Sequence, residues 1–261
     1  MTRIERQSNH SSQQKFRACL FDMDGLLINS EPIYTQITSK LLKDNFGITD
    51  GLSWEVKSQI QGLPGHKAIE ILIDHYHLQD RVTPEQFDKL GQRLQPEFWG
   101  KVGLMPGALE LITYLKFEAH VPICVCTSTK SSKFQMKTSH LGELFDLFDD
   151  NIITGDHKGL KGNGKPNPDI WWLGLAELNE DRVKKGLDEI KPSECLVFED
   201  ALNGALSGKR SGAYVIWIPD HDNLKTISQD VINDIIGENN ENGVLLENLS
   251  QFEPEEFGLL V

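Results

Sequence analysis

The sequence predicts an α/β protein, with a Rossmann-like parallel sheet as its core and an inserted domain made only of helices. From Met105 onward, short apolar runs alternate with helical patterns, and such alternation is typical of βαβ units in a parallel sheet. An earlier apolar run, Ala18–Phe21, is followed by helical patterns alone until residue 100. We therefore expect a core of residues 16–29 and 101–261 and a helical domain of residues 30–100.

The first expected strand, Ala18–Phe21, is followed by two acids, Asp22 and Asp24, and then by Gly25. The run is short and bounded, as in a buried strand. Ligands bind at the carboxyl edge of open α/β sheets, and alternate residues of an extended chain share a face. Both carboxylates can therefore turn toward one site, where one acts as a nucleophile and the other transfers a proton.

Two other structures can begin with Asp-x-Asp-Gly. An EF-hand calcium loop is excluded, because Leu26, Leu27 and Ile33 stand where that loop requires an Asp or Asn, a Gly and a Glu. A solvent-exposed turn is an equal alternative for these four residues taken alone. Polar groups at the ends of later strands favour a catalytic site at Asp22 and Asp24 over an exposed turn.

Residues 30–100 carry start and end signals of several helices. Ser30 followed by Glu31 and Pro32 is typical of a helix start, and Gly47 is typical of a helix end. Further helices are expected over Trp54–Ile60, over Ala68–Tyr76 and from Thr83 onward.

The remaining elements follow in alternation. They are a helix over Pro106–Phe117, a strand over Ile123–Cys126, a helix over Ser132–His140, a strand at Ile152–Ile153, a helix over Asn167–Leu178, a strand over Leu196–Phe198, a helix over Ala201–Arg210 and a strand over Tyr214–Ile218. Helices on both faces of one parallel sheet follow from this order.

Composition limits the partners of the chain. Its 261 residues include 26 basic and 39 acidic side chains, for a net charge of −13. This excess of acids disfavours nucleic acids and anionic membranes as partners. No apolar run reaches the roughly 18 residues of a spanning helix, and nothing indicates an obligate protein partner.

The N-terminus and the cysteines bear on localisation. Residues 1–15 are polar and lack the apolar stretch of a secretory signal, so we expect a flexible leader. The cysteines all lie in expected buried strands, without a Cys-x-x-Cys motif; they are Cys19, Cys124, Cys126 and Cys195. Reduced thiols are the expected state. These features predict a cytoplasmic protein, with the nucleus as an alternative.

Two later junctions carry groups suited to phosphate. Thr127 and Ser128 follow the strand that ends at Cys126, and their hydroxyl and N–H groups can bind phosphoryl oxygens; an ordinary hydroxyl turn is the favoured alternative. Lys165 precedes Pro166, and a fixed ammonium can neutralise a nucleophile and a phosphate together. A solvated loop lysine is the alternative for Lys165.

A third junction ends the strand Leu196–Phe198 with the acids Glu199 and Asp200. With Asp22, Asp200 would complete an all-oxygen site, which suits Mg²⁺. The alternative, compatible with the first, is that Asp200 caps the N-terminus of the following helix.

The order of these groups is more specific than any one of them. Asp-x-Asp at a first strand, Thr at a second, Lys before Pro and Glu-Asp at a third resemble the four motifs of the haloacid dehalogenase superfamily, whose phosphotransferases use an aspartate nucleophile. The helical domain 30–100 resembles the cap that one subgroup carries between its first and second motifs. That subgroup includes phosphoglycolate phosphatase and β-phosphoglucomutase.

A closer resemblance, to the pseudouridine-5′-phosphatase branch, extends from Phe16 to the end of the chain. It is carried by Phe21–Leu27, Ser53–Ser58, Leu104–Ala108, Met136–Ser139, Cys195–Ala201 and Phe257–Leu259. Departures occur at Asn29, Asn167 and the glycines of Gly159–Gly164, and none touches the four motifs.

The resemblance implies a role for each motif residue. Asp22 would be the nucleophile and form an aspartyl-phosphate, while Asp24 would protonate the leaving oxygen and then activate water. Thr127, the Ser128 backbone and Lys165 would bind the phosphoryl group.

The resemblance also implies a cofactor and a contact from the cap. Mg²⁺ would be held by Asp22, the carbonyl of Asp24, Asp200 and, with less weight, Glu199. Lys67, in the glycine-rich segment Gly62–Lys67, would contact a ribose or a base; a solvated lysine is the alternative.

The implied function is a Mg²⁺-dependent phosphatase for a small phosphorylated metabolite. A nucleoside or sugar monophosphate such as pseudouridine 5′-phosphate is the expected substrate. A phosphomutase of the β-phosphoglucomutase type is the first alternative, and a non-catalytic binding protein on the same fold is the second.

Overall fold

A six-stranded parallel sheet forms the centre of the computed structural model, which describes residues 16–60 and 65–259. The strand order is β3-β2-β1-β4-β5-β6, so that β1 and β4 are the central pair. The strands are β1 (Ala18–Phe21), β2 (Ile123–Cys126), β3 (Ile152–Ile153), β4 (Cys195–Glu199), β5 (Tyr214–Trp217) and β6 (Gly243–Leu245). The predicted fold class is confirmed.

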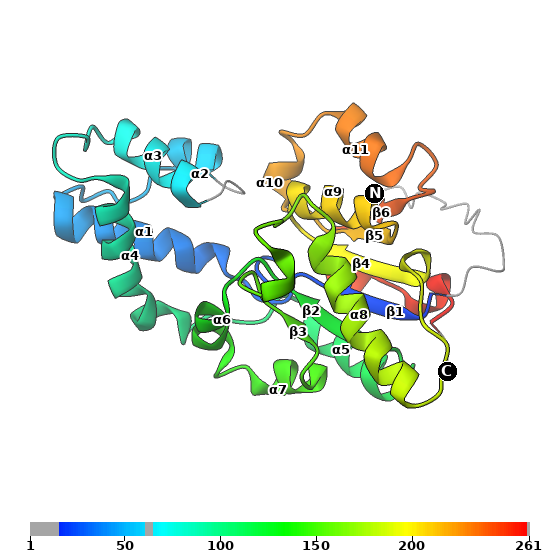
Figure 1. Cartoon of the computed structure of the whole chain (residues 1–261). Helices are drawn as coiled ribbons and strands as arrows, with labels where there is room; N and C mark the ends of the chain where they lie inside the picture. The colour runs from blue at the N-terminus through cyan, green and yellow to red at the C-terminus, as the bar shows by residue number, and fades with distance from the viewer. Residues whose placement is uncertain (1–15, 61–64, 260–261) are drawn as a thin grey trace.

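Helices cover both faces of this sheet (Figure 1). They are α5 (Ala108–Phe117), α6 (Ser131–Thr138), α7 (Gly142–Phe145), α8 (Asp169–Lys184), α9 (Leu202–Ser211), α10 (His221–Leu224) and α11 (Gln229–Ile236). The residues of β1 and β4 alternate between two apolar clusters: Phe21 and Phe198 face α5 and α7, whereas Leu20 and Val197 face α8. Burial on both faces explains why these strands are continuously apolar in the sequence.

Four further helices, here called the helical block, lie between β1 and α5 in the chain and beside the sheet in Figure 1. They are α1 (Glu31–Phe46), α2 (Trp54–Ile60), α3 (Gly65–His75) and α4 (Pro84–Trp99). The block has its own buried cluster, which includes Leu41 and Phe87. Ile33, Ile37 and Trp99, at its two ends, pack into the cluster of the sheet instead. The block is therefore anchored at the points where the chain enters and leaves it.

Most expected elements are present, with shifted ends. Helix α5 begins at Ala108 because Gly107 adopts φ 84° and cannot be part of the helix. The side chain of Asp200 does not cap α9: Ala201 is the N-cap residue, without a side-chain cap, and its N–H is bound by Glu199. The alternative of a helix-capping role for Asp200 is therefore wrong. Strand β6 and the helices after β5 were not predicted.

Two sequence-based expectations concern residues that the structure does not describe, in whole or in part. The leader 1–15 and the first half of the segment Gly62–Lys67 lie outside the described residues. Within the described residues, no helix is long and apolar enough to cross a membrane. The four cysteines are buried and unpaired, as expected, and burial raises the pKa of the Cys195 thiol to about 12.

Candidate active site

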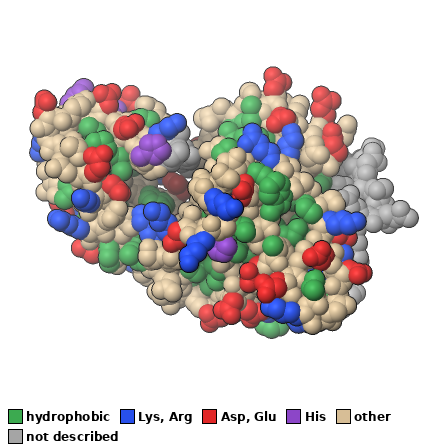
Figure 2. All heavy atoms as spheres, in the orientation of Figure 1, with side chains coloured by type: hydrophobic (Ala, Val, Ile, Leu, Met, Phe, Trp, Pro, Cys, Tyr) green, Lys and Arg blue, Asp and Glu red, His purple; other side chains and the backbone are tan. Residues whose placement is uncertain are grey.

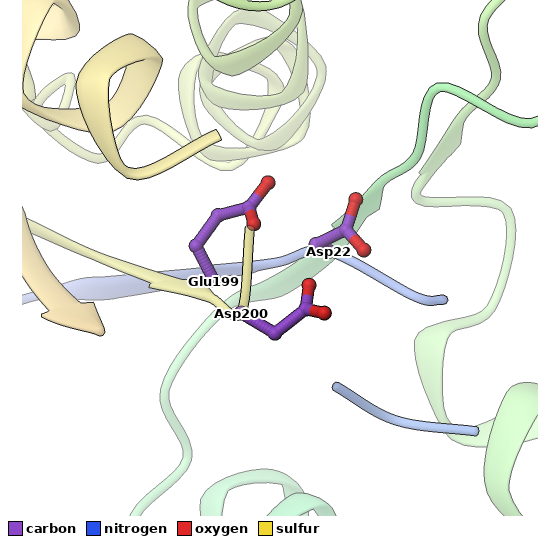
Figure 3. A group of neighbouring side chains, drawn as sticks. All are labelled: Asp22, Glu199 and Asp200. Carbon is purple, nitrogen blue, oxygen red and sulfur yellow. The ribbon is translucent and has the colours of Figure 1, made fainter. Parts of the chain in front are cut away.

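Three carboxylates meet at the carboxyl ends of the central strands (Figure 3). Phe21 of β1 pairs with Phe198 of β4, so the residues that follow each strand become neighbours. An oxygen of each of Asp22, Glu199 and Asp200 lies within 4.8 Å of the others. Adjacent parallel strands thus bring together acids that are far apart in the sequence.

Lys165, in the loop before α8, is bound to two of these acids. Its Nζ donates to Asp22 Oδ1 and to Glu199 Oε1, each at 2.6 Å. The ammonium also lies 4.3 Å from the centre of the Trp171 ring. Because the side chain is only 7% exposed, the alternative of a solvated lysine is wrong.

Two glycines make room for this cluster. A Cβ atom on Gly25 would overlap the carboxylate of Asp200, and Gly25 also has φ 87°, which other residues rarely adopt. A Cβ atom on Gly204, in α9, would overlap the carboxylate of Glu199. The glycine that follows Asp-x-Asp is therefore required by Asp200, the acid that follows β4.

Burial and crowding set the protonation of the acids. Burial raises the pKa of Asp22 to about 7, with the nearby Lys165 charge opposing and the Glu199 charge adding to the rise. Burial, and then the charges of Glu199 and Asp22, also raise the pKa of Asp200 well above its ordinary value. For Lys165, burial lowers the pKa, but the two carboxylates outweigh burial and raise it. The cluster therefore holds more negative charge than one lysine offsets, a condition that favours binding of a cation.

Asp24 faces a second buried lysine, which the sequence analysis missed. Lys137 Nζ donates to Asp24 Oδ1 at 2.6 Å, and Thr129 Oγ1 donates to Asp24 Oδ2 at 2.7 Å. Lys137 lies in α6, three residues after the buried Phe134 and four before the buried Leu141. A lysine on an apolar helix face was the available signal.

The predicted phosphate loop lies at the end of β2. Thr127 is buried, and its Oγ1 accepts a hydrogen bond from the Thr129 N–H at 3.1 Å, which forms the hydroxyl turn named as an alternative. Ser128 is exposed. Their binding to phosphate stays a prediction.

Figure 2 shows a hollow between the lobe of the helical block and the lobe of the sheet. Glu31, at the start of α1, is influenced by charges from both sides: burial raises its pKa, Lys57 of α2 lowers it, and Asp220 and Asp24 raise it. Lys67 is exposed in the first turn of α3. Among the described residues no hydrogen bond joins Lys67 to the site, so its contact with substrate also stays a prediction.

Comparison with known proteins agrees with this geometry. Residues 16–212 match the model of the haloacid dehalogenase-like hydrolase family. The chain is 47% identical to a probable pseudouridine-5′-phosphatase of Saccharomyces cerevisiae, over 93% of this chain and 97% of the relative. It is 32% identical to (DL)-glycerol-3-phosphatase 2 of Arabidopsis thaliana, over 92% and 90% of the two chains.

The fold has a close counterpart among solved structures. A haloacid dehalogenase family hydrolase of Deinococcus radiodurans superposes with a TM-score of 0.70, at 23% identity, over 95% of this chain and 98% of that one. The sequence-based prediction of a phosphoric monoester hydrolase is confirmed by the family match and the phosphatase relatives. The chain belongs to the haloacid dehalogenase-like hydrolase family.

Proposed function

We propose that this enzyme hydrolyses a small phosphorylated metabolite through an aspartyl-phosphate on Asp22, with Mg²⁺ as cofactor. The observation that carries the proposal is the buried Asp22 carboxylate, held at 2.6 Å by Lys165 beside two further acids. A nucleophile needs a fixed position and an offset for its repulsion from a phosphate dianion. Lys165 provides both.

The first chemical step forms one bond and breaks another. A carboxylate oxygen of Asp22 attacks phosphorus, and the bond between phosphorus and the ester oxygen breaks. Asp24 gives its proton to the leaving oxygen, which departs as an alcohol. Thr127 and the backbone of Ser128 hold the phosphoryl oxygens during this transfer.

The second step reverses the direction of proton transfer. Asp24, now ionised, takes a proton from a water molecule, and the water oxygen attacks phosphorus. The bond from phosphorus to Asp22 breaks, so inorganic phosphate leaves and both acids return to their initial states. A positioned acid and base of this kind contributes about 10²–10⁴-fold in rate.

The residues that would hold Mg²⁺ are Asp22, Asp200 and the carbonyl of Asp24. Glu199 contributes less, because Lys165 occupies one of its oxygens and the Ala201 N–H the other. The carboxylate set fits a magnesium ion, which prefers oxygen ligands. Bound there, the ion would neutralise charge on the phosphoryl oxygens.

Pseudouridine 5′-phosphate is the substrate that we propose. The relative at 47% identity over nearly the whole chain is named for it, whereas the glycerol-3-phosphatase at 32% makes glycerol 3-phosphate the second candidate. The helical block would serve as the cap that selects the leaving group, with Lys67 as one contact.

A panel of monophosphates, assayed with and without Mg²⁺, tests this function. We expect phosphate release from pseudouridine 5′-phosphate with a higher kcat/KM than from uridine 5′-phosphate, glycerol 3-phosphate or glucose 1-phosphate. Lys67→Ala should reduce the preference for pseudouridine 5′-phosphate, expressed as its kcat/KM divided by that of uridine 5′-phosphate. This reduction should be larger than the loss of rate on 4-nitrophenyl phosphate. Equal rates on all natural esters would reject pseudouridine 5′-phosphate as the specific substrate. Isomerisation of glucose 1-phosphate would indicate a mutase.

A further inference from the structure

Lys137 is fully buried, yet it touches the candidate proton-transfer acid. The side chain is 0% exposed. Its Nζ bonds to Asp24 Oδ1 at 2.6 Å, to the Tyr34 hydroxyl at 2.9 Å and to Thr129 Oγ1 at 3.2 Å. An ammonium has three N–H donors, so these partners use all of them.

Two aromatic rings of the helical block enclose the same ammonium. Lys137 Nζ lies 4.5 Å from the centre of the Trp99 ring and 5.1 Å from that of Tyr34. The two rings meet edge to face, with centroids 4.9 Å apart. Tyr34 lies in the first turn of α1 and Trp99 is the last residue of α4. Lys137 therefore contacts the block where the chain enters and leaves it.

The energetics argue against a role in packing alone. Burial of an ammonium is costly, and apolar residues that fill the same space are often as stable or more stable. Here the cost is offset by three hydrogen bonds, one of which goes directly to Asp24 and another to Thr129, which itself donates to Asp24. Asp24 Oδ1 accepts from Lys137 and Asp24 Oδ2 accepts from Thr129. Each oxygen of Asp24 thus has its own donor, which fixes the direction in which the carboxylate points.

We propose that Lys137 is a positioning residue for Asp24. With Thr129, it fixes the Asp24 carboxylate for proton transfer to the leaving oxygen, and through Tyr34 and Trp99 it ties that position to the two ends of the helical block. This inference rests on the proposed role of Asp24 in phosphoester hydrolysis. It assigns a task to a lysine outside the four motifs.

The test compares a substrate that needs a proton on its leaving oxygen with one that does not. Lys137→Met keeps an unbranched side chain that is one atom shorter, and it removes the ammonium. We expect kcat to fall by about 10²-fold on pseudouridine 5′-phosphate, a share of what a positioned acid contributes. On 4-nitrophenyl phosphate the fall in the rate of Asp22 phosphorylation should be less than about tenfold, because nitrophenolate leaves without a proton. KM should change little on both, because ground-state binding is untouched.

A double variant separates positioning from a general loss of structure. If Lys137 acts through Asp24, adding Lys137→Met to Asp24→Asn should lower kcat no further, so the two effects are not additive. Lys209→Met is the matched control: it also breaks a lysine–aspartate pair, to Asp234 at 2.7 Å, in the last turn of α9 and outside the site residues. Its kcat should equal that of the wild type on both esters.

Two results would overturn the inference. If Lys137→Met lowers kcat equally on both esters and also lowers the melting temperature, the lysine has only a structural role. Full activity would make it dispensable. If Lys137→Met does not fold, Tyr34→Phe carries the test, since it removes one hydroxyl from a side chain that is 40% exposed. A fall of about two- to tenfold, confined to pseudouridine 5′-phosphate, is expected for one lost hydrogen bond, and no change would reject the inference.

A comparison of Asp24→Asn with Lys137→Met distinguishes a failure of this inference from a failure of the proposed function. If Asp24→Asn hydrolyses pseudouridine 5′-phosphate at the wild-type rate, the role of Asp24 is wrong. If Asp24→Asn is slow and Lys137→Met is not, only the inference about Lys137 fails.

Discussion

The two halves of the candidate site are each built on a buried lysine, but on different parts of the fold. In the nucleophile half, Lys165 binds Asp22 at 2.6 Å, and the surrounding acids come from the ends of β1 and β4. In the acid half, Lys137 binds Asp24 at the same 2.6 Å, and the surrounding rings come from the helical block. The first half depends on strand register, and the second depends on how the helical block packs against the core.

This difference assigns separate tasks to the two halves. In the proposed reaction, the nucleophile half would contact the phosphoryl group and the cation, which are common to every substrate. The acid half would contact the leaving group, which differs between substrates. We therefore expect changes in the nucleophile half to affect all esters alike, and changes in the acid half to depend on the leaving group.

The largest effect should come from Asp22→Asn. Removal of the nucleophile abolishes the covalent route on every ester, so we expect kcat to fall by more than about 10³-fold on pseudouridine 5′-phosphate and 4-nitrophenyl phosphate alike. Steady-state kinetics on both esters, with circular dichroism to confirm folding, checks this. A folded variant with more than a few per cent of wild-type activity would contradict the assignment.

Asp24→Asn should separate the halves. An amide cannot supply the proton, so kcat on pseudouridine 5′-phosphate should fall by about 10²–10⁴-fold. Formation of the phospho-enzyme from 4-nitrophenyl phosphate should fall much less, while its breakdown stays slow because water is not activated. Rapid quenching with labelled substrate measures the phosphate trapped on Asp22. Equal loss on both esters without a trapped intermediate would place Asp24 in another role.

The cation requirement should be sensitive to Asp200 and less so to Glu199. Chelation of Mg²⁺ should abolish activity, and Asp200→Asn should raise the Mg²⁺ concentration for half-maximal rate by about 10–100-fold. Glu199→Gln should raise it less, because both oxygens of Glu199 already have protein partners. Titration of the rate with Mg²⁺ measures these values. Full activity in excess chelator would reject a metal-dependent reaction.

The smallest effect concerns the start of α6, the helix that carries Lys137. The Asp156 carboxylate accepts bonds from the Ser131 N–H and hydroxyl and from the Thr154 hydroxyl, and these lower its pKa to about 2. Because the folded pKa lies below the ordinary value of about 3.9, ionised Asp156 stabilises the fold above that pH. This stabilisation is lost as the pH falls through about 2.

Thermal unfolding of Asp156→Asn checks this prediction. At pH 7 the melting temperature should be lower than that of the wild type by a few degrees. The difference should shrink as the pH is lowered below about 4, where the wild-type carboxyl begins to lose its advantage. A difference that grows toward acid pH would contradict it.

The sequence by itself determined strands β1 to β5 of the sheet and the nucleophile half. Strands buried on both faces are continuously apolar, and ligand-binding loops follow their carboxyl ends, so the positions of Asp22 and Asp200 followed from local patterns. Lys165 was predicted from its place before Pro166 and from its position in the order of the four motifs. The glycine after Asp24 was visible as well, although its close approach to Asp200 was not.

Only the tertiary structure decided the acid half and whether the Asp200 side chain caps α9. Lys137, Tyr34 and Trp99 lie in three helices, and their convergence depends on the packing angle between the helical block and the core, which no local pattern encodes. Similarly, the sequence left Asp200 as a member of the acidic site, as a cap of α9, or as both. In the structure, Glu199 accepts from the Ala201 N–H, while the Asp200 side chain joins the carboxylate cluster. Short-range spacing reports which elements form, whereas contacts between distant side chains form only when those elements pack.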